Sequence, residues 1–170
     1  MPFIKFFQLI IIFCAVAALP FNSIPAGEKA LEFVSTKDGH VFSDLGLSEK
    51  DTPAVRDFKL TGKNPYLGNA GMAKKGFRRY RYHGCIQCHG NKATGSPVMH
   101  GPNLTDENWR HKKSKTDKGM FETIWGGTPD EGHEGSMIAW GGQIPIDEIL
   151  QIMAWVRSVY KGPPETVTWE

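Results

Sequence analysis

The fold of this chain is decided by one short stretch, Gly84-Cys85-Ile86-Gln87-Cys88-His89-Gly90. Within it, Cys-x-x-Cys-His is the attachment signature of c-type haem. Two thiols three positions apart lie on one helical turn, so each can form a thioether with a haem vinyl group. The imidazole that follows lies under the iron. The motif therefore predicts one covalent haem c, attached through Cys85 and Cys88, with His89 as an axial ligand of the iron.

The same pair of cysteines is compatible with two other kinds of site. A thiol–disulfide redox motif is typical of a βαβ context, which no pattern upstream of Cys85 suggests, and it leaves His89 without a role. A bare disulfide or half of a zinc site is the other alternative; no second cysteine pair is present, although scattered histidines offer ligands. Haem attachment accounts for all three residues and is the interpretation we adopt.

Composition sets wider limits on the class of protein. A length of 170 residues with 40% hydrophobic and 22% charged residues is typical of one globular domain with a short appendage. The formal net charge of +2 is too small to indicate nucleic-acid binding. Three cysteines are too few for a scaffold held by many disulfides.

The N-terminus has the pattern of an export signal. Lys5 precedes an almost wholly apolar run over 6–19, and the small residue Ala26 follows a break in that run. The alternative is a retained membrane anchor, but the run is shorter than the roughly 20 residues that span a bilayer. We therefore predict a signal peptide over 1–26, cleaved near Ala26, a periplasmic mature protein and no stable membrane insertion. Cleavage removes Cys14 and leaves only the pair in the motif.

A methionine in a glycine-rich loop is the main candidate for the second axial ligand. Met137 lies in the stretch 135–142, which lacks helical periodicity, so its thioether is free to be directed at the iron. Met153 falls in an apolar helical stripe and is expected in the core. The weaker alternatives are Met99, Met120 and His133.

Four helices are expected around the motif, at 53–60, 70–83, 118–125 and 145–160. Asn69 is a suitable N-cap for the second helix, and Gly76 allows another helix to approach it closely. The partner is expected to be the last helix, with Trp155 lying against Gly76. Before them, 31–42 reads as a β-hairpin around an Asp38-Gly39 turn. The sequence thus predicts a mainly α protein with a hairpin-and-helix extension.

Over 70–160 the chain resembles class I cytochromes c, and over nearly the whole mature chain it resembles the cytochrome cL family. The matching pieces are Gly76-x-x-x-Tyr80, Cys85 to His89, Gly101-Pro102-Asn103-Leu104, Asn108-Trp109, Met137-x-Ala139-Trp140-Gly141 and Ala154-Trp155-Val156-Arg157. The resemblance implies that Pro102 and Leu104 wall the proximal side of the haem, that Trp140 belongs to the haem pocket and that Met137 is the distal ligand. It divides the chain into an extension over 27–69, a haem domain over 70–162 and a tail over 163–170.

The same resemblance implies an electron-transfer protein rather than an enzyme. Cytochromes cL accept electrons from PQQ-dependent methanol dehydrogenase, and the loop from Met137 to Trp140 looks more like those paired with the lanthanide-dependent type. The expected acceptor is a small c-type cytochrome or an oxidase. Two alternatives stay open: a carrier that serves another periplasmic dehydrogenase or a terminal oxidase, and a haem enzyme or sensor.

Two basic clusters and one acidic loop have no assigned role at this stage. The clusters are Lys74, Lys75, Arg78, Arg79 and Arg81, and Arg110, Lys112, Lys113, Lys115 and Lys118. They are either ordinary solvated surface or a means of guiding an acidic partner. The acidic loop over 128–136 is either a partner contact or a solvated lid.

Overall fold

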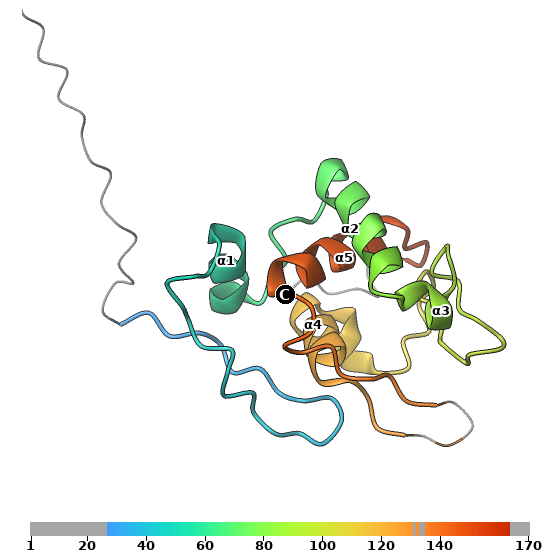
Figure 1. Cartoon of the computed structure of the whole chain (residues 1–170), viewed down its shortest axis with the longest axis horizontal. Helices are drawn as coiled ribbons and strands as arrows, with labels where there is room; N and C mark the ends of the chain where they lie inside the picture. The colour runs from blue at the N-terminus through green and yellow to red at the C-terminus, as the bar shows by residue number, and fades with distance from the viewer. Residues whose placement is uncertain (1–26, 131, 133–134, 164–170) are drawn as a thin grey trace, which may run out of the picture.

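The computed structural model describes residues 27–130, 132 and 135–163 (Figure 1). The predicted signal peptide, His133 and the tail from residue 164 lie outside the described residues. The helices are α1 (Pro53–Thr61), α2 (Ala70–Tyr82), α3 (Cys85–His89), the 3-10 helix η1 (Lys112–Lys115), α4 (Asp117–Gly126) and α5 (Ile146–Ser158). A search of the described part of the chain finds no helix with the length and apolar character needed to cross a membrane.

Helix α2 begins where the sequence predicts, because Asn69 caps it. The side-chain oxygen of Asn69 accepts a hydrogen bond from the backbone N–H of Met72 at 3.1 Å. One turn further on, Gly76 is buried where α2 crosses α5. A Cβ built at Gly76 would lie 1.8 Å from the backbone oxygen of Gln151, so only glycine permits this crossing.

The residue that meets Gly76 is not the one predicted. Gln151 lies under the glycine, one turn before Trp155. Trp155 instead packs against the two aromatic rings that flank the crossing, with ring centroids 5.0 Å from Phe77 and 4.3 Å from Tyr80. The small residue thus lets the backbones touch, and the large side chains fill the space beside the contact.

Helix α5 forms the centre of the core. It begins after Pro145, and every residue from Gln151 to Arg157 is buried. The predicted apolar stripe is confirmed at Ile149, Leu150 and Met153, all fully buried. The polar residues Gln151 and Arg157 of this helix are also buried, because α2, α4 and α1 all contact it.

The extension before α2 is folded onto the rest of the molecule, but the predicted β-hairpin is reduced to one bridge. Val34 and Val41 form an isolated antiparallel bridge, and the described residues contain no strand longer than such a bridge. What holds the segment is aromatic packing. The ring of Phe33 lies 5.5 Å from Phe58 of α1 and 5.4 Å from Phe121 of α4.

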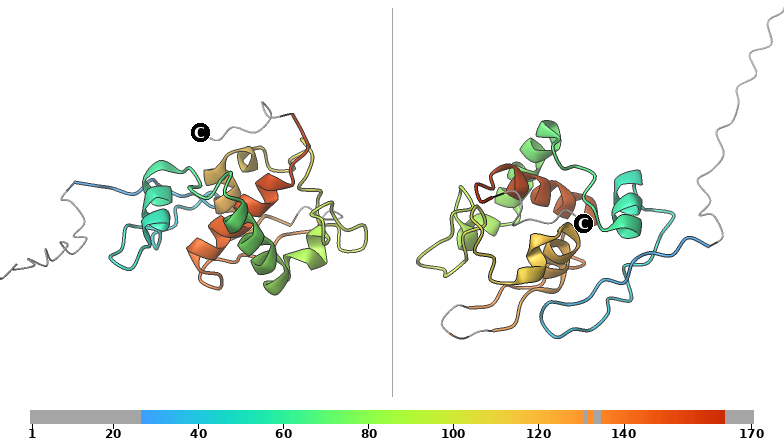
Figure 2. Two further views of the ribbon diagram at one scale, coloured as in Figure 1. Left: turned by 90° about the horizontal axis from the view of Figure 1, so that it is seen from above. Right: turned by 180° about the vertical axis from the view of Figure 1, so that it is seen from behind.

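A buried carboxylate fixes the same segment from the other side. Glu122 of α4 accepts a hydrogen bond from the backbone N–H of Val34 at 2.6 Å and pairs with Lys113 and Lys118. Lys113 in turn donates to the carbonyl of Val34 at 2.8 Å. In all three views of Figures 1 and 2, α1 and α3 lie on opposite sides of α4 and α5. The extension is therefore anchored away from the cysteine motif.

Candidate haem site

A cavity of about 800 Å³ lies between α3, α4, α5 and the loops before α4 and α5. This volume falls within the roughly 300–1,000 Å³ of sites that enclose a small molecule. Its lining includes every residue that the sequence nominated for haem binding: Cys85, Cys88, His89, Pro102, Leu104, Met137 and Trp140. Residues that are far apart in the sequence thus converge on one space.

The two thiols lie on the short helix α3. Gly84 precedes this helix with a φ of 77°, in the left-handed region that favours glycine. Both cysteines are half-buried and free, with no disulfide between them. Burial raises the pKa of the Cys85 thiol to about 11, so this thiol is protonated at neutral pH. Helix α3 presents both sulfur-bearing side chains to the cavity within one turn.

The imidazole of His89 is buried and held by a single backbone acceptor. Its Nδ1 lies 3.1 Å from the carbonyl oxygen of Pro102, so Nδ1 donates the hydrogen bond and Nε2 keeps its lone pair. Burial lowers the pKa of His89, and the nearby Arg110 lowers it further, while the bond to Pro102 opposes both effects. A neutral imidazole with a free Nε2 is the form that binds iron.

The loop that carries Pro102 is pressed against α3. A Cβ at Gly101 would lie 2.0 Å from the carbonyl oxygen of Cys88, so this position also requires glycine. The backbone N–H of Leu104 donates a hydrogen bond to the carbonyl oxygen of Ala93 at 2.8 Å. These contacts hold the Pro102 carbonyl beside His89 and keep Leu104 on the lining of the same cavity.

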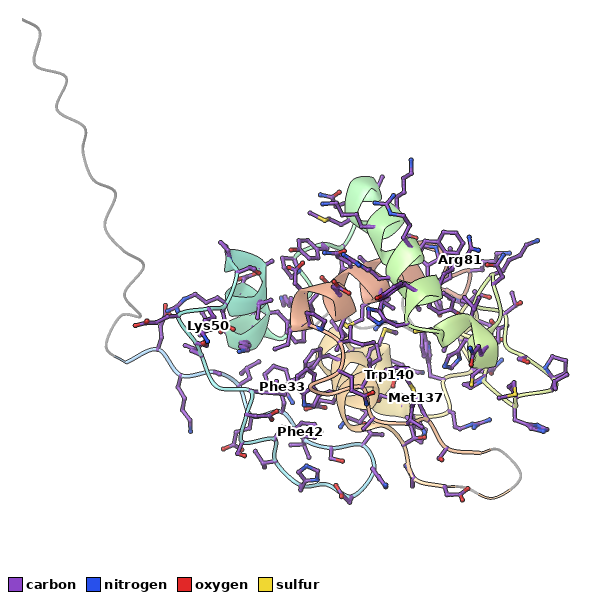
Figure 3. The ribbon with its side chains drawn as sticks, in the orientation of Figure 1. Phe33, Phe42, Lys50, Arg81, Met137 and Trp140 are labelled. Atoms are coloured by element: carbon purple, nitrogen blue, oxygen red, sulfur yellow. The ribbon has the colours of Figure 1, made fainter. Side chains whose placement is uncertain are left out.

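The loop that carries Met137 is fixed to the end of α4. The backbone N–H of Met137 donates to Thr128 Oγ1 at 2.8 Å, and the backbone N–H of Thr128 donates to the Met137 carbonyl at 3.0 Å. Three residues on, Trp140 donates its N–H to the carbonyl of Ile124 at 3.1 Å. Met137 and Trp140 both line the cavity and are drawn below α5 in Figure 3. Sequence reasoning did not single out Thr128, since its role depends on a partner nine residues away.

Other methionines and histidines also reach the cavity. Met99 and Met120 line it, whereas Met153 is fully buried in α5 and is not among the lining residues. Three histidines to which the sequence assigned no role, His83, His100 and His111, are on the lining as well. His83 already pairs with Glu148 at 2.8 Å. Proximity alone therefore does not select one sulfur; the anchored loop favours Met137.

Trp109 provides an independent test of whether a haem fits this space. Its Nε1 is buried, and no described residue offers it a hydrogen-bond acceptor. The indole lines the cavity, stacks on Tyr160 at 6.0 Å and carries the guanidinium of Arg157 over its ring at 5.1 Å. A buried donor without an acceptor costs about 1–3 kcal/mol, and the carboxylates of a haem are acceptors of the kind it lacks. The donor set and this unsatisfied N–H both fit a haem.

Comparisons with known proteins give concordant results. The family model for cytochrome c matches residues 73–160. The chain is similar to the solved cytochrome cL of Methylophaga aminisulfidivorans, with 37% identity over 81% of this chain and 86% of that one and a TM-score of 0.68. The solved cytochrome cL of Hyphomicrobium denitrificans gives 36% identity over 78% and 76% of the two chains and a TM-score of 0.66.

A curated relative extends the same similarity. Cytochrome c-L of Methylorubrum extorquens is 36% identical over 120 residues, which is 71% of this chain and 56% of that protein. The chain thus spans about half the length of this relative. These similarities agree with the mainly helical arrangement of the described residues and with the class I cytochrome c fold.

Proposed function

This chain belongs to the cytochrome cL family of c-type cytochromes, and from that membership we propose that it accepts electrons from a PQQ-dependent methanol dehydrogenase in the periplasm. It is an electron-transfer protein rather than an enzyme, and its cofactor is one covalently bound haem c. A small c-type cytochrome or an oxidase is the acceptor. The observation that carries the proposal is the convergence of Cys85, Cys88, His89 and Met137 on one cavity.

When bound, the haem supplies an iron that alternates between ferric and ferrous states and so carries one electron at a time. In the proposed site Cys85 and Cys88 hold it through thioethers, and His89 presents Nε2 as the proximal ligand. The bond from Nδ1 to Pro102 fixes the tautomer and the orientation of that ring.

Met137 supplies the second axial ligand in this proposal. The reciprocal hydrogen bonds with Thr128 hold its backbone at the end of α4, so that little freedom remains for the loop at this residue. A thioether ligand raises the reduction potential, which favours uptake of electrons from a quinol. If His89 and Met137 both bind the iron, no open position would remain for a substrate.

Apolar side chains keep water from the rest of the cavity. Ile144, Ile152 and Met120 are buried and line it. Around a bound haem, side chains of such low polarity would limit solvent access and favour the iron state of lower net charge. The chain thus contributes ligands, orientation and exclusion of water, while the redox change belongs to the cofactor.

Reduction by a dehydrogenase tests the proposed partner. The purified ferric holoprotein is mixed with a PQQ-dependent methanol dehydrogenase, of the calcium or the lanthanide type, and the ferrous absorption bands are followed. They are expected to develop only when methanol is present. If no such dehydrogenase reduces the protein, the proposal is wrong, and a carrier for another dehydrogenase or for a terminal oxidase is favoured.

The axial ligand is tested separately by spectroscopy. Ferric haem with a methionine ligand has a weak near-infrared band, which should be absent in Met137→Leu. Met99→Leu is the matched control, because Met99 also lines the cavity and the exchange conserves volume. A Met137→Leu protein that keeps the band would show that another residue binds the iron.

A further inference from the structure

The outer face of α2 carries positive charge and no negative charge. The helix contains five basic residues and no acidic one, and it buries Gly76 and Tyr80 against α5. The opposite side is exposed. We define the basic face as its exposed residues Lys74, Lys75, Arg78 and Arg81.

Little in the molecule neutralises this face. Among the described residues, no ion pair or hydrogen bond engages the side chains of Lys74, Lys75 or Arg78, while the Arg81 guanidinium lies 5.8 Å from the ring of Phe77. The neighbouring Arg79 differs, since it pairs with Glu148 at 3.2 Å. The charge of the basic face is therefore available to a partner.

Part of the second basic cluster is already neutralised by ion pairs within the protein. Lys113 and Lys118 both pair with the buried Glu122. Lys113 also donates to the carbonyl of Val34, and the Lys118 ammonium lies 5.3 Å from the ring of Phe33. These two lysines, which the sequence does not distinguish from the lysines of α2, thus hold the N-terminal extension in place.

The basic face ends at the opening of the large cavity. A shallow groove of about 380 Å³ is lined by Phe77, Arg78, Arg81, Tyr82 and Ile86. Tyr82 is 78% exposed and lines both the groove and the large cavity. Met99 and Ile138 are also exposed and line the large cavity. We define the cavity mouth as Tyr82, Met99 and Ile138.

We propose that the basic face and the cavity mouth form one docking surface for a redox protein whose contact face bears carboxylates beside an apolar centre. Resting on the proposed function, this protein is the dehydrogenase that delivers the electron. Opposite charge along α2 speeds the encounter and sets the orientation, and the apolar mouth excludes water from the contact. The position of this docking surface fits electron transfer, because Ile86, which lines the groove, lies between the two cysteines in the sequence.

Charge reversal in the groove tests the docking surface. The variant Arg78→Glu/Arg81→Glu is compared with Lys37→Glu/Lys50→Glu, which reverses the same number of charges at exposed positions in the N-terminal extension. Lys50 and Arg81 lie far apart in Figure 3. The readout is the second-order rate constant for reduction of the ferric holoprotein by the dehydrogenase, measured from low to high salt.

At low ionic strength the groove variant should react about tenfold or more slowly than the wild type. The difference should vanish near 1 M salt, where the screening length is only about 3 Å. Arg78→Lys/Arg81→Lys keeps the charge and should keep the rate, which separates charge from folding. If the two charge-reversal variants slow the reaction equally, only net charge matters and the docking surface is refuted.

Two small oxidants of opposite charge separate this inference from the proposed function. If no methanol dehydrogenase reduces the wild type, the function fails, and the surface is tested with anionic ferricyanide and cationic tris(phenanthroline)cobalt(III), each taking one electron from the ferrous protein. The groove variant should slow the anion and speed the cation, both by more than the control variant does. Equal effects of the two variants on both oxidants overturn the proposal.

Discussion

Replacing Gly76 with alanine tests the closest contact of the fold, where α2 crosses α5. The added Cβ would lie 1.8 Å from the backbone oxygen of Gln151 and 2.5 Å from its carbonyl carbon. Real Cβ atoms essentially never come nearer than 3.0 Å. The obstacle is backbone, which cannot rotate away, so the two helices must separate by roughly 1 Å or more.

The size of the effect follows from the contacts at the crossing. Forced separation of a packed interface costs about 1–3 kcal/mol. Trp155 also loses part of its packing against Phe77 and Tyr80, where each aromatic pair contributes about 0.5–1.5 kcal/mol. The higher helix propensity of alanine returns about 1 kcal/mol. We expect a net loss of about 2–3 kcal/mol and a Tm lower by about 4–12 °C.

The assay is thermal and urea unfolding of the holoprotein, followed by far-ultraviolet circular dichroism. Gly71→Ala is the matched control, since it lies in the same helix and its Cβ would meet only the side-chain oxygen of Asn69, at 3.3 Å. The control should unfold near the wild type. A Gly76→Ala protein as stable as the Gly71→Ala protein would refute the direct backbone contact between α2 and α5.

Three further predictions concern the cavity, the core and the extension. Trp109→Phe keeps an aromatic ring but removes the indole N–H that lacks an acceptor. The reduction potential, measured by redox titration, should fall by some tens of millivolts, where about 59 mV corresponds to 1.36 kcal/mol for one electron. Arg157→Leu leaves its fully buried carboxylate partner without a cation, and urea unfolding should show a loss of about 3–5 kcal/mol. Hydrogen bonds from Ser35 and then His40 hold the pKa of Asp38 down at about 2. Because this pKa is lower in the folded state, its contribution to stability is present above pH 3.8 and is lost as the pH falls through about 2; NMR titration of the carboxyl measures it.

Each of these predictions has a result that contradicts it. An unchanged potential in Trp109→Phe would mean that the indole N–H does not meet the cofactor. For the ion pair, the half-exposed Arg79 provides the control, since its bond to Glu148 should contribute about 0–1 kcal/mol; equal losses at Arg79 and Arg157 would contradict the role of burial. An Asp38 carboxyl that titrates near 3.8 would mean that its turn does not form.

The cysteine motif and the helices could be predicted because their signals are local. Two thiols and an imidazole within five positions report haem chemistry wherever the chain folds. Caps and stops act within one turn, so the predicted start of α2 after Asn69 agrees with the structure, and the predicted end of α1 at residue 60 lies one residue before the observed end at Thr61. The hairpin prediction was less successful: a turn signal at Asp38 and Gly39 does not reveal that packing of Phe33, rather than a strand ladder, holds the segment.

The rest of the site depends on contacts that no local pattern contains. Gly76 signals a close approach without naming Gln151 as its neighbour. The unsatisfied N–H of Trp109 appears only when every potential acceptor nearby has been placed. The anchoring of Met137 requires Thr128. Each is a relation between segments that the chain brings together on folding.

By itself, then, the sequence identified the cofactor and predicted its attachment residues, because covalent chemistry and helical spacing act over a few neighbouring positions. The tertiary structure decided which charges remain available. Lys113 and Lys118 pair with the buried Glu122, whereas Arg78 and Arg81 line the groove beside the cavity mouth and pair with no described acidic residue. Charge is a property of one residue, but its neutralisation depends on where an opposite charge comes to lie, and that is set only when distant segments pack.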